Sequence, residues 1–264
     1  SIRQALSLFR RALQTAVPEL LDHNPAADVE VPTQRAGAEY HIDADLAAKK
    51  IFLPEQMVLF LAEIKRTDAL HGLYVYFALL FELGPRRGEG LGLRRKDIDF
   101  AQKTIRIAQQ VTRNPVTNAT AITTPKTEAG KRDLPISDSM TLLLREQCLR
   151  VGAARPNDLV FPGEDGRQRQ PNSVTQLFRR ACKRLEKRRL EAIEAGERDP
   201  GYNLVDYTLH SLRKYAVTDW RISGMDLEVA AAMAGHKAQG VTAQVYSVPT
   251  MDRKRAAVNK KKTP

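Results

Sequence analysis

The segment "TLHSLRKY" (residues 208–215) places two side chains that can bind anions on one face of an expected helix. His210 and Arg213 are three residues apart, and residues at this spacing are neighbours on a helix surface. Both side chains can therefore reach a single anionic group. The same pair is compatible with an ordinary half-exposed polar face, so its meaning depends on the residues that accompany it.

Four further residues supply the groups needed to cleave a phosphodiester without a metal ion. Such a site needs cations around the phosphate, a nucleophile, and a proton donor for the leaving oxygen. The guanidinium of Arg86 can bind two phosphate oxygens at once, and the hydroxyl of Tyr246 can act as the nucleophile. Lys126, at the end of an expected strand, can donate the proton. His236 follows Gly235, which is expected to end a helix over 226–234.

Each assignment has an alternative in the sequence. Arg86 adjoins Arg87, and either can be a surface charge. Lys126 competes with Lys131 across an expected turn, and we prefer Lys126. His236 can simply pack beside the helix cap.

The nucleophile has rivals as well. A single tyrosine near a chain end is often a half-buried packing residue, because its ring is apolar and its hydroxyl polar. Tyr202, Tyr207 and Tyr215 are close to Tyr246 in the sequence. Only the spacing of ten residues from His236 distinguishes Tyr246 from them.

The elements that must position these residues are mostly helical. Apolar spacing predicts helices over 54–65 and 69–83, the second ending at Gly84-Pro85 before a short helix or turn at "RGEGLGL". Three segments between turn residues have strand character, namely 104–111, 120–124 and 132–136. From residue 137 the pattern is helical, with loops near 152–172 and 196–206. The sequence thus predicts a mixed α/β, mostly α-helical fold in which a small three-stranded antiparallel sheet carries Lys126.

The N-terminal part predicts a domain boundary. Residues 2–17 carry an apolar helical stripe that Pro18 should end, and "HNPAADVEVPTQ" then reads as a linker. A lone helix cannot bury its own apolar face. We therefore expect residues 1–23 to be the terminal helix of an upstream domain, 24–41 to be an interdomain linker, and 42–264 to be a compact domain with a basic tail.

Composition indicates a polyanionic partner. The 264 residues carry a formal net charge of +11, and this excess is typical of nucleic-acid-binding proteins. Seven basic residues and one acid lie in 179–189, and six basic residues and one acid lie in 251–262. No run of apolar residues is long enough for a membrane span. Cys148 and Cys182 have no metal-ligand spacing, so we expect free thiols, no zinc, no cofactor, and a reducing cytoplasmic compartment.

Taken in order, these segments resemble the tyrosine recombinase, or phage-type integrase, family. Five matching segments in the family's order are highly specific, and the resemblance covers nearly all of 42–250. "HNPAADVEVP" also resembles the join between the family's core-binding and catalytic domains. The five segments are "GPRRGEGLGLRRKDI" with Arg86, "TPKTEAGKRDLPI" with Lys126, "HSLRKYAVT" with His210 and Arg213, "MAGHKAQ" with His236, and "VYS" with Tyr246.

The resemblance implies the tyrosine recombinase catalytic fold and a role for each residue. Tyr246 would attack a DNA phosphate, giving a 3′-phosphotyrosyl link and a free 5′-hydroxyl, without metal or ATP. Arg86 and Arg213 would hold the phosphate oxygens, and His236 would hydrogen-bond to the same phosphate. His210 would assist proton transfer at the tyrosine. Lys126 would protonate the departing oxygen. Glu89 would orient its neighbours, and Asp97 would be structural.

Three features depart from the family pattern. Pro85 stands where the family more often has an apolar residue, and it should stiffen the turn. Arg95 occupies a position that is often aromatic, so packing near 93–98 should differ. The stretch 187–206 is longer than a minimal member needs, and we favour a solvated excursion over an insertion that touches DNA.

The resemblance also implies partners. We expect double-stranded DNA, a homotetramer on DNA, a monomer free in solution, and accessory DNA-bending proteins, as in recombinases of phages and other mobile elements. One alternative is a catalytically silent DNA-binding module of the same fold that regulates recombination, since the basic clusters would bind phosphates regardless of the active site. Another is a type IB topoisomerase, which shares the chemistry and relaxes supercoils.

Overall fold

The computed structural model describes residues 10–15, 17, 23–27, 50–67, 72–114, 116–125, 130–199 and 203–235. The chain divides into two units, Ser1–Ile42 and Asp43–Pro264. In the first unit residues 10–14 are helical. There Arg10 donates from Nε to the Ala26 carbonyl at 2.7 Å, and Asn24 donates from Nδ2 to the Arg10 carbonyl at 2.9 Å. Pro18 and most of the expected linker lie outside the described residues, so the predicted division into domains stays a prediction.

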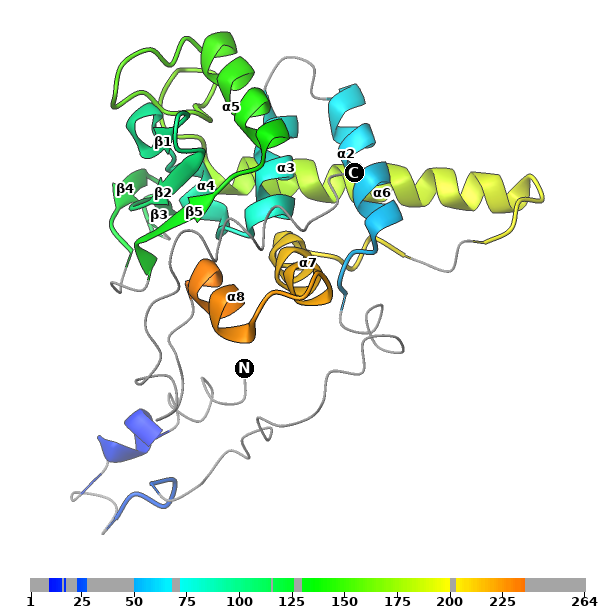
Figure 1. Ribbon diagram of the computed structural model, residues 1–264. Coiled ribbons are helices and arrows are strands. Elements are labelled where there is room, and N and C mark those ends of the chain that lie inside the picture. Colours follow the sequence, from blue (N-terminus) through cyan, green and yellow to red (C-terminus); the bar gives the residue numbers. More distant parts are fainter. Residues whose placement is uncertain are drawn as a thin grey trace. The chain divides into compact units, whose positions relative to one another are not determined.

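The second unit is built around one apolar helix, α3 (Leu73–Leu83), in which nine of eleven residues are buried. Figure 1 shows α3 at the centre of the unit, and the helices α2, α5 and α7 all contact it. The remaining helices are α2 (Pro54–Thr67), α4 (Arg87–Leu91), the 3₁₀ helix η1 (Arg95–Asp97), α5 (Asp138–Arg150), α6 (Pro171–Glu194), α7 (Leu209–Ile222) and α8 (Leu227–Ala234).

The predicted helices are confirmed with small changes at their ends. The second begins at Leu73 rather than near 69, because Gly72 has left-handed backbone with φ 67°. It ends as predicted at Gly84, whose φ is 56°. A Cβ on Gly84 would lie 3.1 Å from the Ala216 Cβ on α7. Glycine is therefore required here both for the backbone conformation and for the close approach of α3 and α7.

The predicted three-stranded antiparallel sheet is confirmed in kind and in two of its three strands. The three-stranded antiparallel sheet has the order β1 (Ile98–Asp99), β2 (Thr104–Ile107), β5 (Arg132–Pro135), and the sequence did not predict β1. The expected strand 104–111 ends at residue 107, and a second strand, β3 (Gln110–Arg113), pairs with β4 (Thr120–Thr123) in a separate two-stranded sheet.

The break between β2 and β3 has a local cause. Gln109 donates from Nε2 to the Gly92 carbonyl at 2.6 Å, just after α4. A Cβ on Gly92 would lie 3.1 Å from the Gln110 Cα, so the backbone runs tightly over the end of the helix. The Gln109 side chain thus bonds to the residue that follows α4, and the β2 ladder ends at Ile107. Lys126, expected at the end of the β4 segment, lies outside the described residues.

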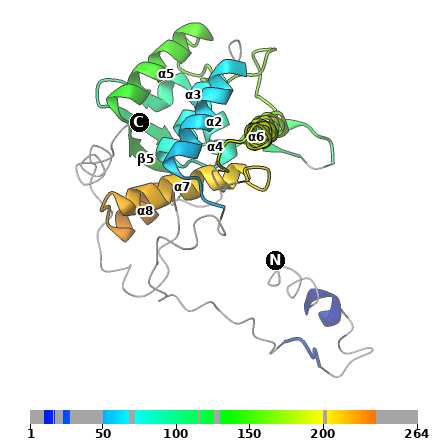
Figure 2. The ribbon, with the colours of Figure 1, turned by 90° about the vertical axis from the view of Figure 1, so that its right-hand side faces the viewer.

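Helix α6 accounts for the long stretch after 187. Its second half projects beyond the neighbouring helices in Figure 1, and Figure 2 views it along its axis. Arg189 contacts Glu186 at 2.8 Å and Asp199 at 2.5 Å, which ties the following turn back to the helix. Most described residues of 187–206 are exposed, as expected of a solvated excursion.

The core contains a cluster of edge-on aromatic rings. Phe60 lies at its centre, with ring centroids 5.1–5.9 Å from four other phenylalanines. The cluster joins α2, α3 and α6, and Tyr207 extends it from the loop before α7. Its phenylalanines are Phe52, Phe60, Phe77, Phe81 and Phe178.

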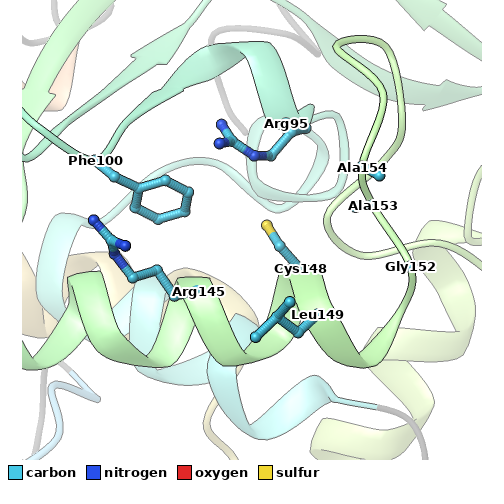
Figure 3. A pocket seen from close by; sticks show the side chains of 8 residues that line it. All are labelled: Arg95, Phe100, Arg145, Cys148, Leu149, Gly152, Ala153 and Ala154. Carbon is cyan, nitrogen blue, oxygen red and sulfur yellow. The ribbon is translucent and has the colours of Figure 1, made fainter.

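Both cysteines are buried free thiols, as predicted. Burial raises the pKa of the Cys148 thiol and raises that of Cys182 to about 12. Near the predicted departure at 93–98, the Arg95 guanidinium lies 4.7 Å from the centre of the Phe100 ring, and that of Arg145 lies 4.8 Å from it. Figure 3 shows these three side chains around a pocket of about 460 Å³ that Cys148 also lines.

None of the described helices combines the length and the apolar character that crossing a lipid bilayer demands.

Removing the central ring should destabilise the fold strongly. Phe60 is 0% exposed, so Phe60→Ala leaves a cavity between α2, α3 and α6. We expect the free energy of unfolding to fall by about 3–5 kcal/mol in urea denaturation followed by circular dichroism. Leu142→Ala is the control, because Leu142 is 62% exposed, and its effect should stay within about 0.5 kcal/mol. Equal stabilities of the two variants would contradict the assigned core.

Candidate active site

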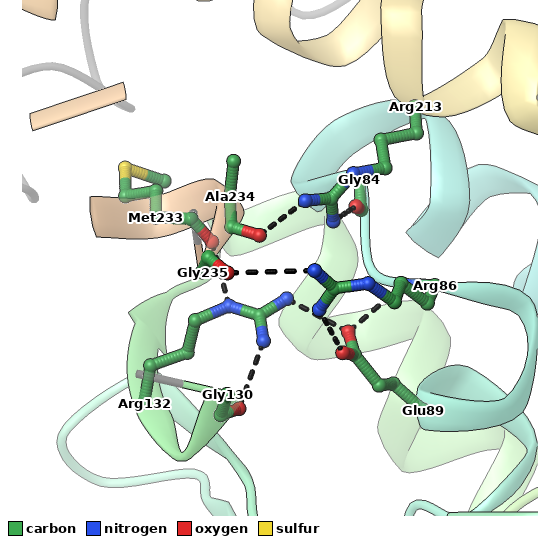
Figure 4. Close-up of polar contacts among 9 residues, drawn as sticks. All are labelled: Gly84, Arg86, Glu89, Gly130, Arg132, Arg213, Met233, Ala234 and Gly235. Carbon is green, nitrogen blue, oxygen red and sulfur yellow. Dashed lines mark hydrogen bonds and ion pairs between the residues drawn. The ribbon is translucent and has the colours of Figure 1, made fainter. Parts of the chain in front are cut away.

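Three arginines from different elements meet at the C-terminal end of α8 (Figure 4). The last carbonyls of a helix lack partners within the helix and carry partial negative charge. Here three consecutive carbonyls each accept a hydrogen bond from a different guanidinium. The donors and acceptors are Arg132 Nε to Met233 at 2.7 Å, Arg213 Nη2 to Ala234, and Arg86 Nη2 to Gly235 at 3.4 Å. Gly235 ends α8 with a left-handed φ of 65°, as the sequence predicted.

Glu89 is the buried carboxylate that holds this group together. Its Oε1 accepts from Arg86 Nη1 at 2.7 Å, and its Oε2 accepts from Arg132 Nη2 at 2.8 Å and from the Arg86 backbone N–H at 2.9 Å. Burial raises the pKa of Glu89, but the bonds and charges of Arg132 and Arg86 outweigh it and hold the pKa below its usual value. The carboxylate is therefore ionised at neutral pH. It orients its neighbours, as the sequence predicted.

Arg213 is far more deeply buried than Arg86. It is 5% exposed, and it donates from Nη1 to the Gly84 carbonyl at 2.6 Å as well as to Ala234. Burial and the positive charges of Arg86 and Arg132 lower the pKa of Arg213 to about 10. Arg213 is therefore protonated at neutral pH, and three arginines share the single carboxylate of Glu89 within the described part of this cluster.

His210 lies one turn before Arg213 on α7 and is exposed. Partial desolvation and the positive charges of Lys214, Arg213 and Arg86 lower its pKa below the usual value. The imidazole is therefore neutral at pH 7 and can accept a proton. The prediction that one helix carries both His210 and Arg213 is confirmed.

The two adjacent arginines before α4 have different surroundings. The Arg86 side chain turns toward Glu89 and Gly235 and remains 47% exposed. Arg87 instead donates from Nη1 to the Thr175 hydroxyl on α6 at 2.7 Å. A surface depression of about 460 Å³ lies between these arginines, β3 and the start of α6. The arginine cluster therefore opens to solvent on the side of Arg86.

The structure brings together Arg86, His210 and Arg213. Lys126, His236 and Tyr246 lie outside the described residues, as does Tyr202. Lys131, the rival of Lys126, is exposed beside Gly130.

Two rival tyrosines are packing residues. Tyr207 donates to the Ile51 carbonyl at 3.4 Å, and the Tyr215 ring packs on Phe81 at 5.3 Å. Burial raises the pKa of both hydroxyls, that of Tyr215 to about 12. Asp97 has the expected structural role, because it accepts from the Arg94 backbone N–H at 2.9 Å.

Sequence reasoning did not identify Arg132. This residue is 7% exposed and contacts Glu89, Met233 and Gly130. The available signal is its phase in the strand. In β5 Arg132 is buried, Asp133 is exposed and Leu134 is buried. Because side chains alternate between the two faces of a strand, Arg132 shares the inward face with the apolar Leu134. A charged side chain in that phase needs a buried partner.

Comparison with known proteins relates this chain to the phage integrase family, a tyrosine recombinase and a transposase. The model of the phage integrase family matches residues 50–253. The tyrosine recombinase XerC-like protein of Caldanaerobacter subterraneus subsp. tengcongensis is 26% identical over 204 residues, which cover 70% of this chain and 48% of that protein. The transposase from transposon Tn916 of Enterococcus faecalis is 24% identical over 220 residues, 80% of this chain and 51% of that protein. The chain thus spans about half the length of these curated relatives.

A solved structure shows the same fold. The integrase of transposon Tn1549, in complex with transposon right end DNA, superposes with a TM-score of 0.69 at 21% identity, covering 98% of this chain and 78% of that chain. This likeness confirms the predicted fold class, a mostly helical α/β domain with small antiparallel sheets.

The carboxylate of Glu89 should stabilise the fold in a pH-dependent manner. Glu89→Gln leaves buried guanidiniums without their counter-charge, so at pH 7 we expect the free energy of unfolding to fall by about 3–5 kcal/mol. The folded-state pKa of Glu89 is lowered. Its contribution is therefore complete above the unfolded pKa of about 4.3 and is lost as the pH falls through the folded value. Urea denaturation from pH 7 to pH 3 should show the two proteins converging.

Asp138→Asn provides the control, because Asp138 pairs with Lys103 at an exposed site. Its effect should be about 0.2–1 kcal/mol. A Glu89→Gln variant as stable as wild type at pH 7, or a difference that does not change with pH, would contradict the role given to Glu89.

Proposed function

The chain belongs to the phage integrase family, and we propose that it is the catalytic part of a tyrosine-type site-specific DNA recombinase. The observation that carries this proposal is the cluster in which Arg86 and Arg213 meet at the end of α8. The next residue in the sequence after this end is His236, and Tyr246 follows ten residues later. Both arginines thus lie beside the point from which the chain continues to the proposed nucleophile.

The proposed substrate is double-stranded DNA. A phosphodiester is an anion with two non-bridging oxygens, and planar guanidiniums bind such a group through paired hydrogen bonds. Arg86 is half exposed beside an open depression, and Arg213 backs it from the interior. The net charge of +11 favours association with the DNA backbone. The structurally similar Tn1549 integrase is itself bound to DNA, which supports the same ligand here.

Strand cleavage would proceed by attack of the Tyr246 oxygen on a DNA phosphorus. The tyrosine–phosphorus bond forms as the bond to the 5′-oxygen breaks, leaving a 3′-phosphotyrosyl link and a 5′-hydroxyl. His210 takes the tyrosine proton, and Lys126 gives a proton to the departing oxygen. Arg86 and Arg213 stabilise the charge on the non-bridging oxygens, and His236 bonds to the same phosphate. The covalent link conserves the energy of the phosphodiester, so a second DNA end rejoins without ATP, as in type IB topoisomerase chemistry.

The state of two rival tyrosines in the described part of the chain supports Tyr246 as the nucleophile. Tyr207 and Tyr215 are buried in the core, and their raised pKa values disfavour the phenolate needed for attack. The neutral state of His210 at pH 7 supports its role as proton acceptor. Lys126 remains preferred over Lys131 from its place in the family segment.

A catalytically silent DNA-binding module is not favoured. Binding to phosphates requires only surface charge, whereas burying Arg213 and Arg132 carries a desolvation cost that must be offset by fixed partners. Such a cluster of fixed arginines is suited to stabilising the negative charge that develops on one phosphate during strand cleavage. A type IB topoisomerase would share the cleavage step and differ by relaxing supercoiled DNA without a second site.

For the whole protein we propose a homotetramer on DNA and a monomer in free solution, with accessory DNA-bending proteins. The family and the transposase relative support an origin in a phage or another mobile element. We place the action of the protein at the nucleoid in the cytoplasm.

Replacing the nucleophile should abolish covalent capture and spare binding. Tyr246→Phe removes only the attacking oxygen. Wild type and variant would be incubated with a pool of nicked suicide duplexes with randomised centres and resolved on denaturing gels. We expect a covalent band only in wild type, with unchanged retention of DNA on native gels. Tyr215→Phe, which keeps the packed ring, should still form the band. A covalent band in the Tyr246→Phe lanes would refute the assignment.

The capture rate should depend on the protonation of His210. Its pKa is lowered by partial desolvation and by Lys214, Arg213 and Arg86, so the neutral form persists to pH values below about 6.5. Wild type should therefore keep its rate down to that range and lose it as the imidazole becomes protonated. His210→Gln should be slower by at least about 10²-fold and lack this acid limb. Rates measured under single-turnover conditions from pH 5 to 8 test this, and an identical acid limb in the variant would exclude His210 as the base.

A further inference from the structure

Arg132 makes an ion pair that is buried on both sides. Its side chain is 4% exposed and that of Glu89 is 2% exposed. The three nitrogens of its guanidinium have three different partners. Nε donates to the Met233 carbonyl, Nη1 to the Gly130 carbonyl at 3.0 Å, and Nη2 to Glu89 Oε2. Because each nitrogen is assigned, the guanidinium has one orientation. It connects β5, α4 and the end of α8 through a single side chain (Figure 4).

These contacts determine how Glu89 meets Arg86. Oε2 is shared between Arg132 and the Arg86 backbone N–H, and only Oε1 contacts the Arg86 guanidinium. The carboxylate therefore contacts that guanidinium through one oxygen, although a bidentate pair is the common arrangement for arginine and carboxylate. Without Arg132, both carboxylate oxygens could turn to Arg86. The positive charge of Arg86 would then be neutralised by Glu89, although the proposed function requires that charge for binding the phosphate.

The remaining bonds of Arg132 align the segments on either side. The Met233 carbonyl precedes the Ala234 and Gly235 carbonyls that accept from Arg213 and Arg86. Gly130 follows, by four residues, the position of Lys126 in the sequence. One buried side chain thus fixes the carbonyl end of α8 relative to the strand that follows the lysine segment.

We propose that Arg132 is a positioning residue for strand cleavage, which holds Glu89 so that Arg86 keeps its charge available to the phosphate. The inference rests on the proposed recombinase function. Arg132 acts through Glu89 and the α8 carbonyls and does not itself contact DNA.

Arg132→Gln should slow the chemical step without weakening DNA binding. Misplacing groups that surround the reacting phosphate reduces a rate by about 10²-fold. We therefore expect single-turnover covalent capture to be about 10²-fold slower. The DNA dissociation constant should change less than about threefold, because the contacts of other basic residues with the DNA phosphates persist. Arg132→Lys keeps a cation with a single bonding centre, and it should capture DNA faster than Arg132→Gln and slower than wild type.

A double variant separates positioning from general stability. If Arg132 acts by restraining Glu89, then adding Glu89→Gln to Arg132→Gln should slow capture no further, and the two changes should be non-additive. Arg95→Gln is the matched control. Arg95 also bonds to a carbonyl, that of Ile98 at 3.3 Å, and it packs on Phe100 in the pocket of Figure 3, so its loss should leave capture unchanged.

A crystal structure of Arg132→Lys provides a readout that does not depend on activity. We expect Glu89 to turn toward both terminal nitrogens of Arg86. Retention of the wild-type Glu89 geometry, or wild-type capture rates in both Arg132 variants, would overturn the inference. If Arg132→Gln does not fold by circular dichroism, Arg132→Lys alone decides. Absence of capture by wild type, together with the turned Glu89, would instead refute the recombinase function and leave only the restraint of Glu89 by Arg132 established.

Discussion

The hydrogen bonds at the carbonyl end of α8 are the constraint on which the rest of the site depends. A helix end must find partners for its last carbonyls, and a buried guanidinium must find acceptors for its N–H groups. Met233, Ala234 and Gly235 satisfy both requirements at once, because each bonds to a different arginine. The arginines come from β5, from α7 and from the residue before α4, so one helix end fixes the positions of three other elements.

The second requirement is electrostatic. Three guanidiniums in one place repel one another, and the pKa of Arg213 is lowered first by burial and then by this repulsion. Glu89 reduces the repulsion without cancelling the charge, since one carboxylate faces three cations. The exposed fraction rises from Arg132 and Arg213 to Arg86, so the remaining positive charge is presented on one side only. A charge held in this manner needs no reorganisation when an anion arrives.

The helical body keeps this arrangement rigid. The carbonyl of Gly84, at the end of α3, accepts from Arg213, and the absence of a side chain there lets α7 approach closely. Helix α3 is in turn enclosed by the aromatic cluster that joins it to α2 and α6. The position of Arg213 therefore depends on the packing of the whole core.

The sequence by itself determined the local features of this protein. Helix limits at Gly84 and Gly235, the shared helix of His210 and Arg213, and the buried thiols follow from periodicity and local chemistry, and the structure confirms them. The orienting role of Glu89 is implied by the family resemblance, and its bonds to Arg86 and Arg132 agree with it. The tertiary structure decided which side chains meet. Arg132 lies 43 residues from Glu89 and 101 residues from Met233, and the choice between Arg86 and Arg87 depends on Thr175 of α6. β2 pairs with β1 and β5 rather than β4, because a strand's partners depend on the tertiary surfaces beside it as well as on its own residues. Local propensity acts over a few residues, whereas burial and charge pairing join residues that only the folded chain brings into contact.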